Sequence, residues 1–559
     1  MQAIYDIPEI LFQHGIIDVV LSPGSRCAPL SIAFARHKKL NIKIIPDERS
    51  AAFIALGMSL QTEKPTVLIC TSGSALYNYA PAIAEAYYQR VPLIVLSADR
   101  PPEWIDQNDG QTIRQQHIYG SHVKSFFQLA AEHELPSTQW ETYRKINEAV
   151  NISEAYPKGP VHVNIPFREP FYPKKDIQFS EVPPVIKRET PVATLSQESW
   201  KNIQTKLDSF KKILFVCGQQ MYSESLRLSI GNIQAPFIGE VVSNLHGVRN
   251  VIHTHDTLLT SLSVDTLNAL KPDLVISFGN ALLSKPLKEF IRNNDTVTHW
   301  YVGPDEITAD VFKHLKEIVP VNVEEFISHI TIASSNQKQY LESWIDQQNR
   351  FIPLIKEFHK SEHTFTEFTT VNQILNYLPP HSALHLANSM SVRYANILGI
   401  SQKSIQVYAN RGTSGIDGVI STAYGFAIKY QEIVTVITGD IAFFYDRNAF
   451  WNNYKPENIR VVLLNNHGGG IFRMIDGPSG IPELEEYFET KQSLNAKFMA
   501  AENGLEYTLC KNYNDLNRVL ENFFQPSMFG KIIEIETSSI KNTELFKRFK
   551  KTIRQHYAK

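Results

Sequence analysis

Cysteine is scarce in this chain of 559 residues, which contains four: Cys27, Cys70, Cys217 and Cys510. Their scatter matches no zinc site and suggests a reducing compartment. A net charge of -2 gives no reason to expect a nucleic-acid partner. No apolar run is long enough to cross a bilayer, and the N-terminus lacks the basic flank and cleavage site of a signal peptide. These absences predict a cytoplasmic protein that neither binds nucleic acid nor inserts into a membrane.

Two signatures of enzyme sites are also missing. His467-Gly-Gly-Gly470 resembles the oxyanion-hole motif of some lipases, but that reading needs a Gly-x-Ser-x-Gly nucleophile elbow, and the chain has none. The middle third of the chain has no Gly-x-Gly-x-x-Gly after any predicted strand, so we assign it no dinucleotide.

The sequence does contain a regular alternation of short apolar runs with helical patterns, which is typical of parallel sheets covered on both faces. The length predicts about three or four domains. We therefore predict an α/β fold of three doubly wound parallel-sheet domains. The expected divisions are 1–175 for a first domain, 176–197 for a linker, 198–335 for a central domain, 336–361 for a polar connecting helix and 362–559 for a third domain.

Buried strands are predicted where apolar, β-branched residues run together. The first and third domains could be two copies of one sheet plan. The predicted strands are 16–21, 42–45, 66–70, 92–98, 160–165, 213–217, 236–240, 274–278, 383–386, 405–408, 433–438, 459–464 and 531–535.

The stretch from Val434 to Phe472 carries the strongest functional signal. One apolar run ends in Gly439-Asp440, a helical segment follows, and a second run ends in Asn465-Asn466. In parallel sheets, ligands bind beyond the carboxyl ends of the strands, where both polar pairs are expected. A carboxylate, an amide oxygen and a backbone carbonyl are the hard ligands that Mg²⁺ takes. The glycines that follow, Gly468 to Gly470, would let the backbone approach a phosphate.

Each polar pair alone is a common turn at the end of a strand. Both pairs together, followed by three glycines, resemble the motif by which thiamine-diphosphate enzymes hold their cofactor and metal. The third residue of that motif is usually small. Here it is Ile441, which leaves the metal ligands intact.

Further motifs narrow the resemblance, because they occur in the order found in one family of thiamine enzymes. The chain resembles the 2-succinyl-5-enolpyruvyl-6-hydroxy-3-cyclohexene-1-carboxylate synthases of menaquinone biosynthesis over essentially its whole length. The motifs are Ser22-Pro-Gly-Ser-Arg26, Asp47-Glu-Arg49, Ser97-Ala-Asp-Arg-Pro-Pro-Glu103, Ala387-Asn-Ser-Met-Ser-Val-Arg393, Asn410-Arg-Gly-Thr-Ser-Gly-Ile-Asp417 and Gly439-Asp440 with Asn465-Asn-His-Gly-Gly-Gly-Ile-Phe472.

The resemblance implies a catalytic and cofactor-binding role for Glu48. The aminopyrimidine ring of thiamine diphosphate needs a proton at N1′, and a carboxyl group in an apolar pocket, with its pKa raised by desolvation, supplies it. The alternative is an ordinary first-turn acid that complements the helix dipole.

The implied reaction is decarboxylation of 2-oxoglutarate and conjugate addition of the succinyl carbanion equivalent to isochorismate. Both substrates carry carboxylates, for which arginine is the suited side chain. Each arginine alone is more often a surface ion-pair partner. The resemblance places the 2-oxoglutarate portion against Asn388, Ser389, Arg393 and Arg411, and isochorismate against Ser25, Arg26, Arg100, Gln111 and Lys285.

The remaining implied contacts belong to the cofactor and its metal, which is Mg²⁺ with Mn²⁺ as the alternative. Asn388 and Ser389 would also contact thiamine diphosphate, and Asp440, Asn466 and the Gly468 carbonyl would hold the metal. Gly110 stands where the family often has Asn, and Lys285 rests on a short match. The other cofactor contacts are Gly469, Ile416, Ile471 and Phe472, although Ile416 could equally be a core residue.

Two other functions stay open at this point. A simple 2-oxoacid decarboxylase or an acetolactate-synthase-like carboligase would share the cofactor motif without needing four pocket arginines. A regulatory relative without activity would have been suggested by loss of Glu48 or Asp440, and both are present. The family builds its sites between subunits, so we expect a homodimer or tetramer.

Overall fold

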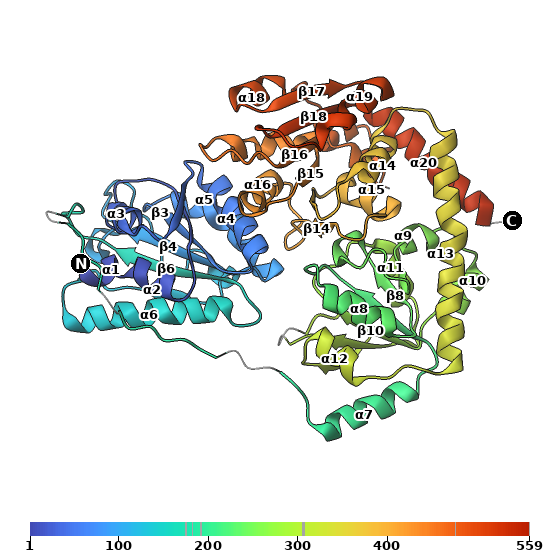
Figure 1. Cartoon of the computed structure of the whole chain (residues 1–559), viewed down its shortest axis with the longest axis horizontal. Helices are drawn as coiled ribbons and strands as arrows, with labels where there is room; N and C mark the ends of the chain where they lie inside the picture. The colour runs from blue at the N-terminus through green and yellow to red at the C-terminus, as the bar shows by residue number, and fades with distance from the viewer. Residues whose placement is uncertain (174–175, 181–182, 190–192, 305–307, 476, 558–559) are drawn as a thin grey trace.

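A computed structural model describes residues 1–173, 176–180, 183–189, 193–304, 308–475 and 477–557. The chain forms three six-stranded parallel sheets, each covered by helices (Figure 1). The first domain, in blue, lies beside α16 of the third domain, and the central domain, in green, adjoins the third domain, in orange to red. This arrangement confirms the predicted fold class.

The first domain contains a sheet in the order β2-β1-β3-β4-β6-β5. Its four-stranded centre is buried on both faces, which is why these strands read as apolar runs. The strands are β1 Asp18–Leu21, β2 Asn41–Ile44, β3 Thr66–Cys70, β4 Leu93–Asp99, β5 Phe126–Gln128 and β6 Pro160–Pro166, and the helices are α1 Gln2–Tyr5, α2 Ile7–Gln13, α3 Ala28–Arg36, α4 Glu48–Thr62, α5 Ala75–Gln89 and α6 Pro136–Glu154.

The central sheet has the order β12-β11-β10-β7-β8-β9. Numbered from its own first strand, this is the 3-2-1-4-5-6 order of doubly wound nucleotide-binding folds, read from the opposite edge. Its strands are β7 Ile213–Cys217, β8 Phe237–Gly239, β9 Val251–Ile252, β10 Leu274–Phe278, β11 Thr298–Val302 and β12 Leu315–Val319, and its helices are α7 Gln197–Asp208, α8 Glu224–Asn232, α9 His255–Leu258, α10 Val264–Leu270, α11 Lys285–Arg292 and α12 Val323–His329.

The third sheet, β14-β13-β15-β16-β18-β17, repeats the strand order of the first strand for strand. The two outer domains therefore share one sheet plan, as the sequence suggested. The strands are β13 Ala383–Leu386, β14 Gln406–Tyr408, β15 Val434–Gly439, β16 Ile459–Asn465, β17 Glu506–Cys510 and β18 Lys531–Glu536, and the α-helices are α14 Glu367–Tyr377, α15 Met390–Leu398, α16 Val419–Lys429, α17 Asp440–Tyr445, α18 Lys497–Glu502, α19 Tyr513–Phe523 and α20 Ser539–Tyr557.

Helix α13, Ser335–Ser361, runs along the edge of the central and third domains (Figure 1). We expected a polar helix at 336–361, but α13 is amphipathic. Trp344 and Phe351 are fully buried in the core that the two domains share. Among the described residues, no helix is both long and apolar enough to cross a membrane.

The first and third domains meet through α4 and α16, and this contact brings the two helix backbones together. A Cβ atom on Gly57 would lie 1.9 Å from the carbonyl oxygen of Thr422, and one on Gly425 would lie 1.9 Å from that of Ile54. No side chain fits at either position, so both glycines are required by the packing. The helix that carries Glu48 is thereby fixed against the third domain.

Candidate active site

The carboxylate predicted to bind the metal lies where β15 ends and α17 begins. Asp440 is 1% exposed, and it accepts hydrogen bonds from Gln492 Nε2 at 2.6 Å and from the Ile441 backbone N–H at 3.0 Å. Burial raises the pKa of Asp440 to about 6, and these hydrogen bonds oppose the rise. A buried carboxylate with a raised pKa gains stability from a nearby cation.

The second polar pair follows the neighbouring strand, because β16 pairs in parallel with β15 up to Gly439 and Leu464. Asn465 has a structural role, since its amide donates to Glu534 Oε1 at 2.6 Å. Asn466 directs its Nδ2 at Glu367 Oε1, and its Oδ1 is buried with no hydrogen-bond partner among the described residues. An unpartnered buried amide oxygen is costly, and a hard cation would satisfy it.

The glycine run pairs its N–H groups within the protein instead of offering them to a phosphate. Gly469 donates to the Glu489 carbonyl at 2.6 Å, and Gly470 donates to the Gly468 carbonyl at 3.0 Å. A Cβ on Gly468 would lie 2.8 Å from the Glu489 carbonyl oxygen, so this glycine is needed for close packing. The Gly468 carbonyl keeps a second lone pair for a metal. The donor set of Asp440, Asn466 and Gly468 thus fits Mg²⁺.

The residues assigned to 2-oxoglutarate come together in the third domain. Arg411 donates to Asn388 Oδ1 at 2.7 Å, and Arg393 donates to the Ser389 carbonyl at 2.6 Å. Burial lowers the pKa of both guanidinium groups. Ser389 has a φ of 73°, a strained conformation for a non-glycine residue that is typical of functional sites. Two partly buried arginines without a carboxylate hydrogen bond among the described residues have the charge and the free donors to pair with an anion.

The apolar residues assigned to the cofactor lie in two segments of the same domain. Ile416 is 42% exposed in the loop before α16, so it is not a core residue of this chain. Ile471 and Phe472 lie in the short helix Gly470–Arg473 that follows the glycine run. Phe472 packs against Phe488, with ring centroids 5.7 Å apart.

Glu48 lies at the start of α4 in the first domain, apart from the site residues of the third domain described above. It is half-buried and borders a cavity whose other lining residues all belong to the first domain. Gln111 lines the same cavity, and Arg100 contacts the adjoining loop, donating to the Gly110 carbonyl at 2.7 Å. The lining is mostly polar, in contrast to the predicted apolar pocket: Thr71, Ser72, Gly73, Ser74, Ala75, Asp109, Gln111, Thr112 and Ile113.

Three residues assigned to isochorismate lie neither among the third-domain site residues nor around the Glu48 cavity. Ser25 is exposed, whereas Arg26 is 5% exposed, donates to the Phe167 carbonyl at 3.1 Å and stacks on Phe171. The Lys285 side chain is 85% exposed and pairs with Glu289 at 3.5 Å. Within one chain, Arg26 is therefore engaged inside the first domain, and Lys285 is free to turn toward a ligand.

Glu48 and the predicted metal ligand Asp440 of the same chain lie near opposite ends of helix α17. Arg49, next to Glu48, donates to the Tyr445 carbonyl at 2.7 Å, and Asn448 donates to Asp47 Oδ2 at 2.7 Å. The start of α4 thus meets the C-terminal end of α17, while Asp440 stands at its N-terminal end.

Sequence reasoning missed three polar residues that support the site. Gln492 bonds both Asp440 and Asn465, Glu367 bonds Asn466, and Glu85 accepts from the backbone N–H groups of Gly412 and Thr413, next to Arg411. Burial raises the pKa of Glu367 to about 7. The only signal for Glu367 was Thr366-Glu367, which looks like any helix start.

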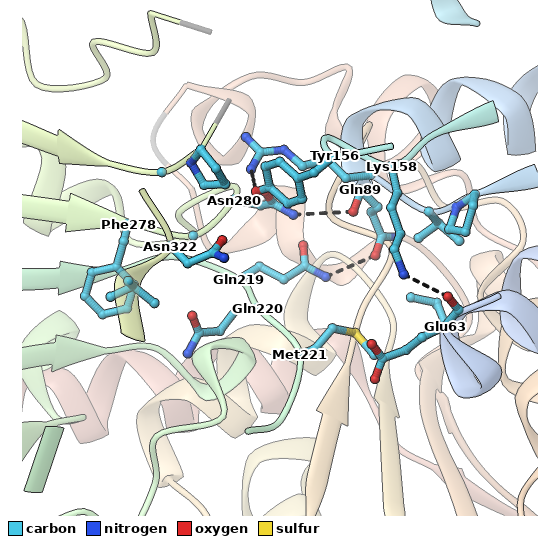
Figure 2. A pocket seen from close by; sticks show the side chains of 18 of the residues that line it. Glu63, Gln89, Tyr156, Lys158, Gln219, Gln220, Met221, Phe278, Asn280 and Asn322 are labelled. Atoms are coloured by element: carbon cyan, nitrogen blue, oxygen red, sulfur yellow. Dashed lines mark hydrogen bonds between the residues drawn. The ribbon is translucent and has the colours of Figure 1, made fainter. Parts of the chain in front are cut away.

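A cavity of about 380 Å³ lies where the three domains meet, at the carboxyl ends of β7 and β10 (Figure 2). Figure 2 shows Gln219 extending toward Gln89 of the first domain. The backbone amides at this switch point are already paired, Gly218 with Phe278, Gln219 with Ala281 and Asn280 with Gln219. These three N–H groups are therefore not available to cradle a diphosphate.

The fold and site are those of a known class of enzyme. Residues 2–118 match the family described as thiamine pyrophosphate enzyme, N-terminal TPP binding domain, and residues 195–386 match the family described as middle domain of thiamine pyrophosphate. The chain is therefore a thiamine pyrophosphate enzyme, pyrophosphate being another name for diphosphate.

Full-length relatives define the family within this class. The chain is 76% identical over 557 residues, covering 100% of both chains, to the 2-succinyl-5-enolpyruvyl-6-hydroxy-3-cyclohexene-1-carboxylate synthase of Cytophaga hutchinsonii. It is 36% identical over 553 residues, or 98% of each chain, to the synthase of that name from Flavobacterium johnsoniae. With the synthase of Porphyromonas gingivalis it shares 34% over 554 residues, 97% of this chain and 95% of the relative. The chain belongs to the 2-succinyl-5-enolpyruvyl-6-hydroxy-3-cyclohexene-1-carboxylate synthase family.

Proposed function

We propose that this enzyme decarboxylates 2-oxoglutarate and adds the resulting succinyl unit to isochorismate, giving the product named by its family, as a step of menaquinone biosynthesis. The observation that carries the proposal is full-length identity of 76% to a synthase of that name. These relatives favour the synthase over an acetolactate-synthase-like carboligase. A cytoplasmic location stays a prediction.

The cofactor would be held through a divalent metal, Mg²⁺ or Mn²⁺, at Asp440, Asn466 and the Gly468 carbonyl. The support is the buried Asn466 Oδ1, which has no partner among the described residues. The first turn of α15, next to Ser389, adds the Met390 and Ser391 N–H groups for the diphosphate, whereas the Val392 N–H already donates to the Ala387 carbonyl at 3.1 Å. When bound, thiamine diphosphate supplies an electron sink for the decarboxylation.

Glu48 would hold a proton at the pyrimidine end of the cofactor. The residue lines a cavity at the start of a helix that packs closely against the third domain. Its walls in this chain are mostly polar, so the apolar surroundings that would favour its protonated form must come from a bound cofactor or another subunit.

The arginines would orient the two anionic substrates. Arg393 and Arg411 are partly buried and already aligned by Ser389 and Asn388, so they can take the 2-oxoglutarate carboxylate with little loss of side-chain entropy. Gln111 borders the Glu48 cavity and Arg100 contacts the adjoining loop, and both would receive isochorismate, together with Ser25, Arg26 and Lys285. Bringing two anions to one reacting carbon is chiefly a positioning task.

We infer that each site is shared between two subunits of a dimer or a tetramer. The start of α4 meets the end of α17 that is remote from Asp440, and the Glu48 cavity is lined by the first domain alone. A second subunit that places its Asp440 end against this cavity would bring the two groups together.

The proposed reaction is tested by incubating the enzyme with thiamine diphosphate, Mg²⁺ and 2-oxoglutarate, with and without isochorismate. Product should form only when both substrates are present, and Arg393→Ala should impair decarboxylation while Arg100→Ala spares it and raises the KM for isochorismate. Ready decarboxylation with no coupled product would identify a simple decarboxylase instead. The opposite effects of the two arginine variants would overturn the substrate assignment.

A further inference from the structure

Glu367 is a buried carboxylate whose two oxygens contact two different elements of the third domain. It lies in the first turn of α14 and is 2% exposed. Its Oε1 accepts from Asn466 Nδ2, and its Oε2 accepts from the Tyr394 hydroxyl of α15 at 3.2 Å. Its own backbone N–H donates to Asn542 Oδ1 of α20 at 3.1 Å. Three elements therefore fix the position of this carboxylate.

A fixed carboxylate decides which way a neighbouring amide faces. Ionised Glu367 can only accept hydrogen bonds, so it binds the NH₂ end of the Asn466 amide and repels the carbonyl end. The Asn466 Oδ1 must then point to the opposite side, where it is buried without a partner among the described residues. That atom is the one proposed above as a metal ligand.

Close packing keeps this arrangement in place. A Cβ at Gly470 would lie 2.9 Å from Asn466 Nδ2, so a side chain there would press on the amide where it meets Glu367. Partners that orient a metal ligand without touching the metal commonly change metal affinity when they are removed.

We propose that Glu367 is a positioning residue for the metal site, which turns the Asn466 amide so that its oxygen faces the cation. The inference rests on the proposed function, because it presumes that Asn466 is a metal ligand. It assigns Glu367 an orienting role through hydrogen bonding, in which the negative charge of the carboxylate itself is dispensable.

The test is a calorimetric titration of the metal-free enzyme with Mg²⁺ in the presence of thiamine diphosphate. Glu367→Ala frees the amide to rotate and should weaken Mg²⁺ binding about 10- to 100-fold. Glu367→Gln should bind Mg²⁺ close to the wild-type level, because a glutamine oxygen still accepts from Asn466 and the Tyr394 hydroxyl can accept from the glutamine NH₂. Tyr394→Phe, the matched control, keeps the Asn466 contact and should bind Mg²⁺ normally.

Two outcomes would overturn the proposal. If Glu367→Gln binds Mg²⁺ as weakly as Glu367→Ala, Glu367 acts through its charge. If Glu367→Ala binds Mg²⁺ as the wild type does, Glu367 has no part in the metal site. Asp440→Ala separates these results from failure of the proposed function, since a metal site at Asp440 and Asn466 predicts that this variant no longer binds Mg²⁺. Unchanged Mg²⁺ binding by Asp440→Ala would place the metal elsewhere. Thermal unfolding of each metal-free variant verifies that it is folded.

Discussion

Glu48 stands in the first turn of α4, where an acid complements the helix dipole even without a catalytic role. The two roles differ in what they predict for Glu48→Gln. An amide cannot share a proton with the pyrimidine ring, so hydrogen–deuterium exchange at C2 of the bound cofactor should slow by orders of magnitude, while cofactor affinity changes little.

NMR of the enzyme–cofactor complex measures this exchange. Glu198→Gln is a suitable control, because Glu198 is also a first-turn acid, in α7, and is exposed far from the site. Exchange at the wild-type rate in Glu48→Gln would leave Glu48 as a helix-end acid only.

At the residue scale, the sequence could predict the positions of site residues that directly follow a strand, because the order of the strands determines their neighbours. Asp440 and Asn466 are at the ends of adjacent parallel strands, so their approach could be foreseen from the apolar runs before them. Glu367 and Gln492 come from segments remote in the chain, and no local pattern marks where a helix start or a loop will pack. Lys285 rested on a short match, and within the part of the chain that the structure describes its recorded ion pair is with Glu289.

Among the helices, α4 and α16 make the contact that tolerates least change. Gly425→Ala would normally favour a helix, but here its Cβ would meet the Ile54 carbonyl oxygen at 1.9 Å. The helices must separate, and we expect a loss of about 1–3 kcal/mol or more in the free energy of unfolding. Gly231→Ala in α8 is the control, because its nearest neighbour would be 3.9 Å away. Denaturant unfolding compares the two, and equal stabilities would contradict the close approach of the helices.

The junction of α16 and α17 holds a buried acid whose ionisation affects stability. Asp446 is fully buried, it accepts from the Ser421 N–H and hydroxyl, and burial raises its pKa from 3.8 to about 7. The folded state therefore binds this proton more tightly than the unfolded chain. The stabilisation that the protonated Asp446 carboxyl gives the folded state is complete below about pH 4, and it is lost as the pH rises through about 7.

Asp446→Asn removes this titration and can keep both bonds to Ser421. The variant should match the wild type near the acid end of that range and exceed it above about pH 7, by an amount on the order of a few kcal/mol. Unfolding free energies of both proteins across this pH range measure the difference. A difference that does not vary with pH would show that Asp446 stays ionised throughout.

Most of the strands that the sequence failed to predict share a position at the edge of a sheet. Those at 66–70, 213–217, 274–278 and 383–386 were predicted residue for residue, because central parallel strands are apolar on both faces. Four of the five that were missed, β5, β9, β12 and β17, lie at the edges of their sheets, and the fifth, β11, lies next to an edge. Edge strands are short or partly exposed, so their residues alternate or mix and give no apolar run.

For the whole molecule, the decisive question is whether one chain can complete a site. Inactive Glu48→Gln and Asp440→Ala chains, dissociated together and reassembled, should regain part of the activity if sites are shared. In a mixed dimer, one site would carry both defects and the other neither. Mixed dimers are isolated by two affinity tags and assayed for product. If they form and remain as inactive as the parents, each site is built within one chain.

The contact between α4 and α16 is also symmetric. Each helix joins the second strand of its domain to the third, since α4 lies between β2 and β3 and α16 lies between β14 and β15. Gly57 faces residue 422 while Gly425 faces residue 54, so each helix offers the other an equivalent surface about a local twofold axis. This is the geometry of a self-complementary homodimer. The matching strand orders and this symmetric contact are what two copies of one sheet domain, joined in a single polypeptide, would give.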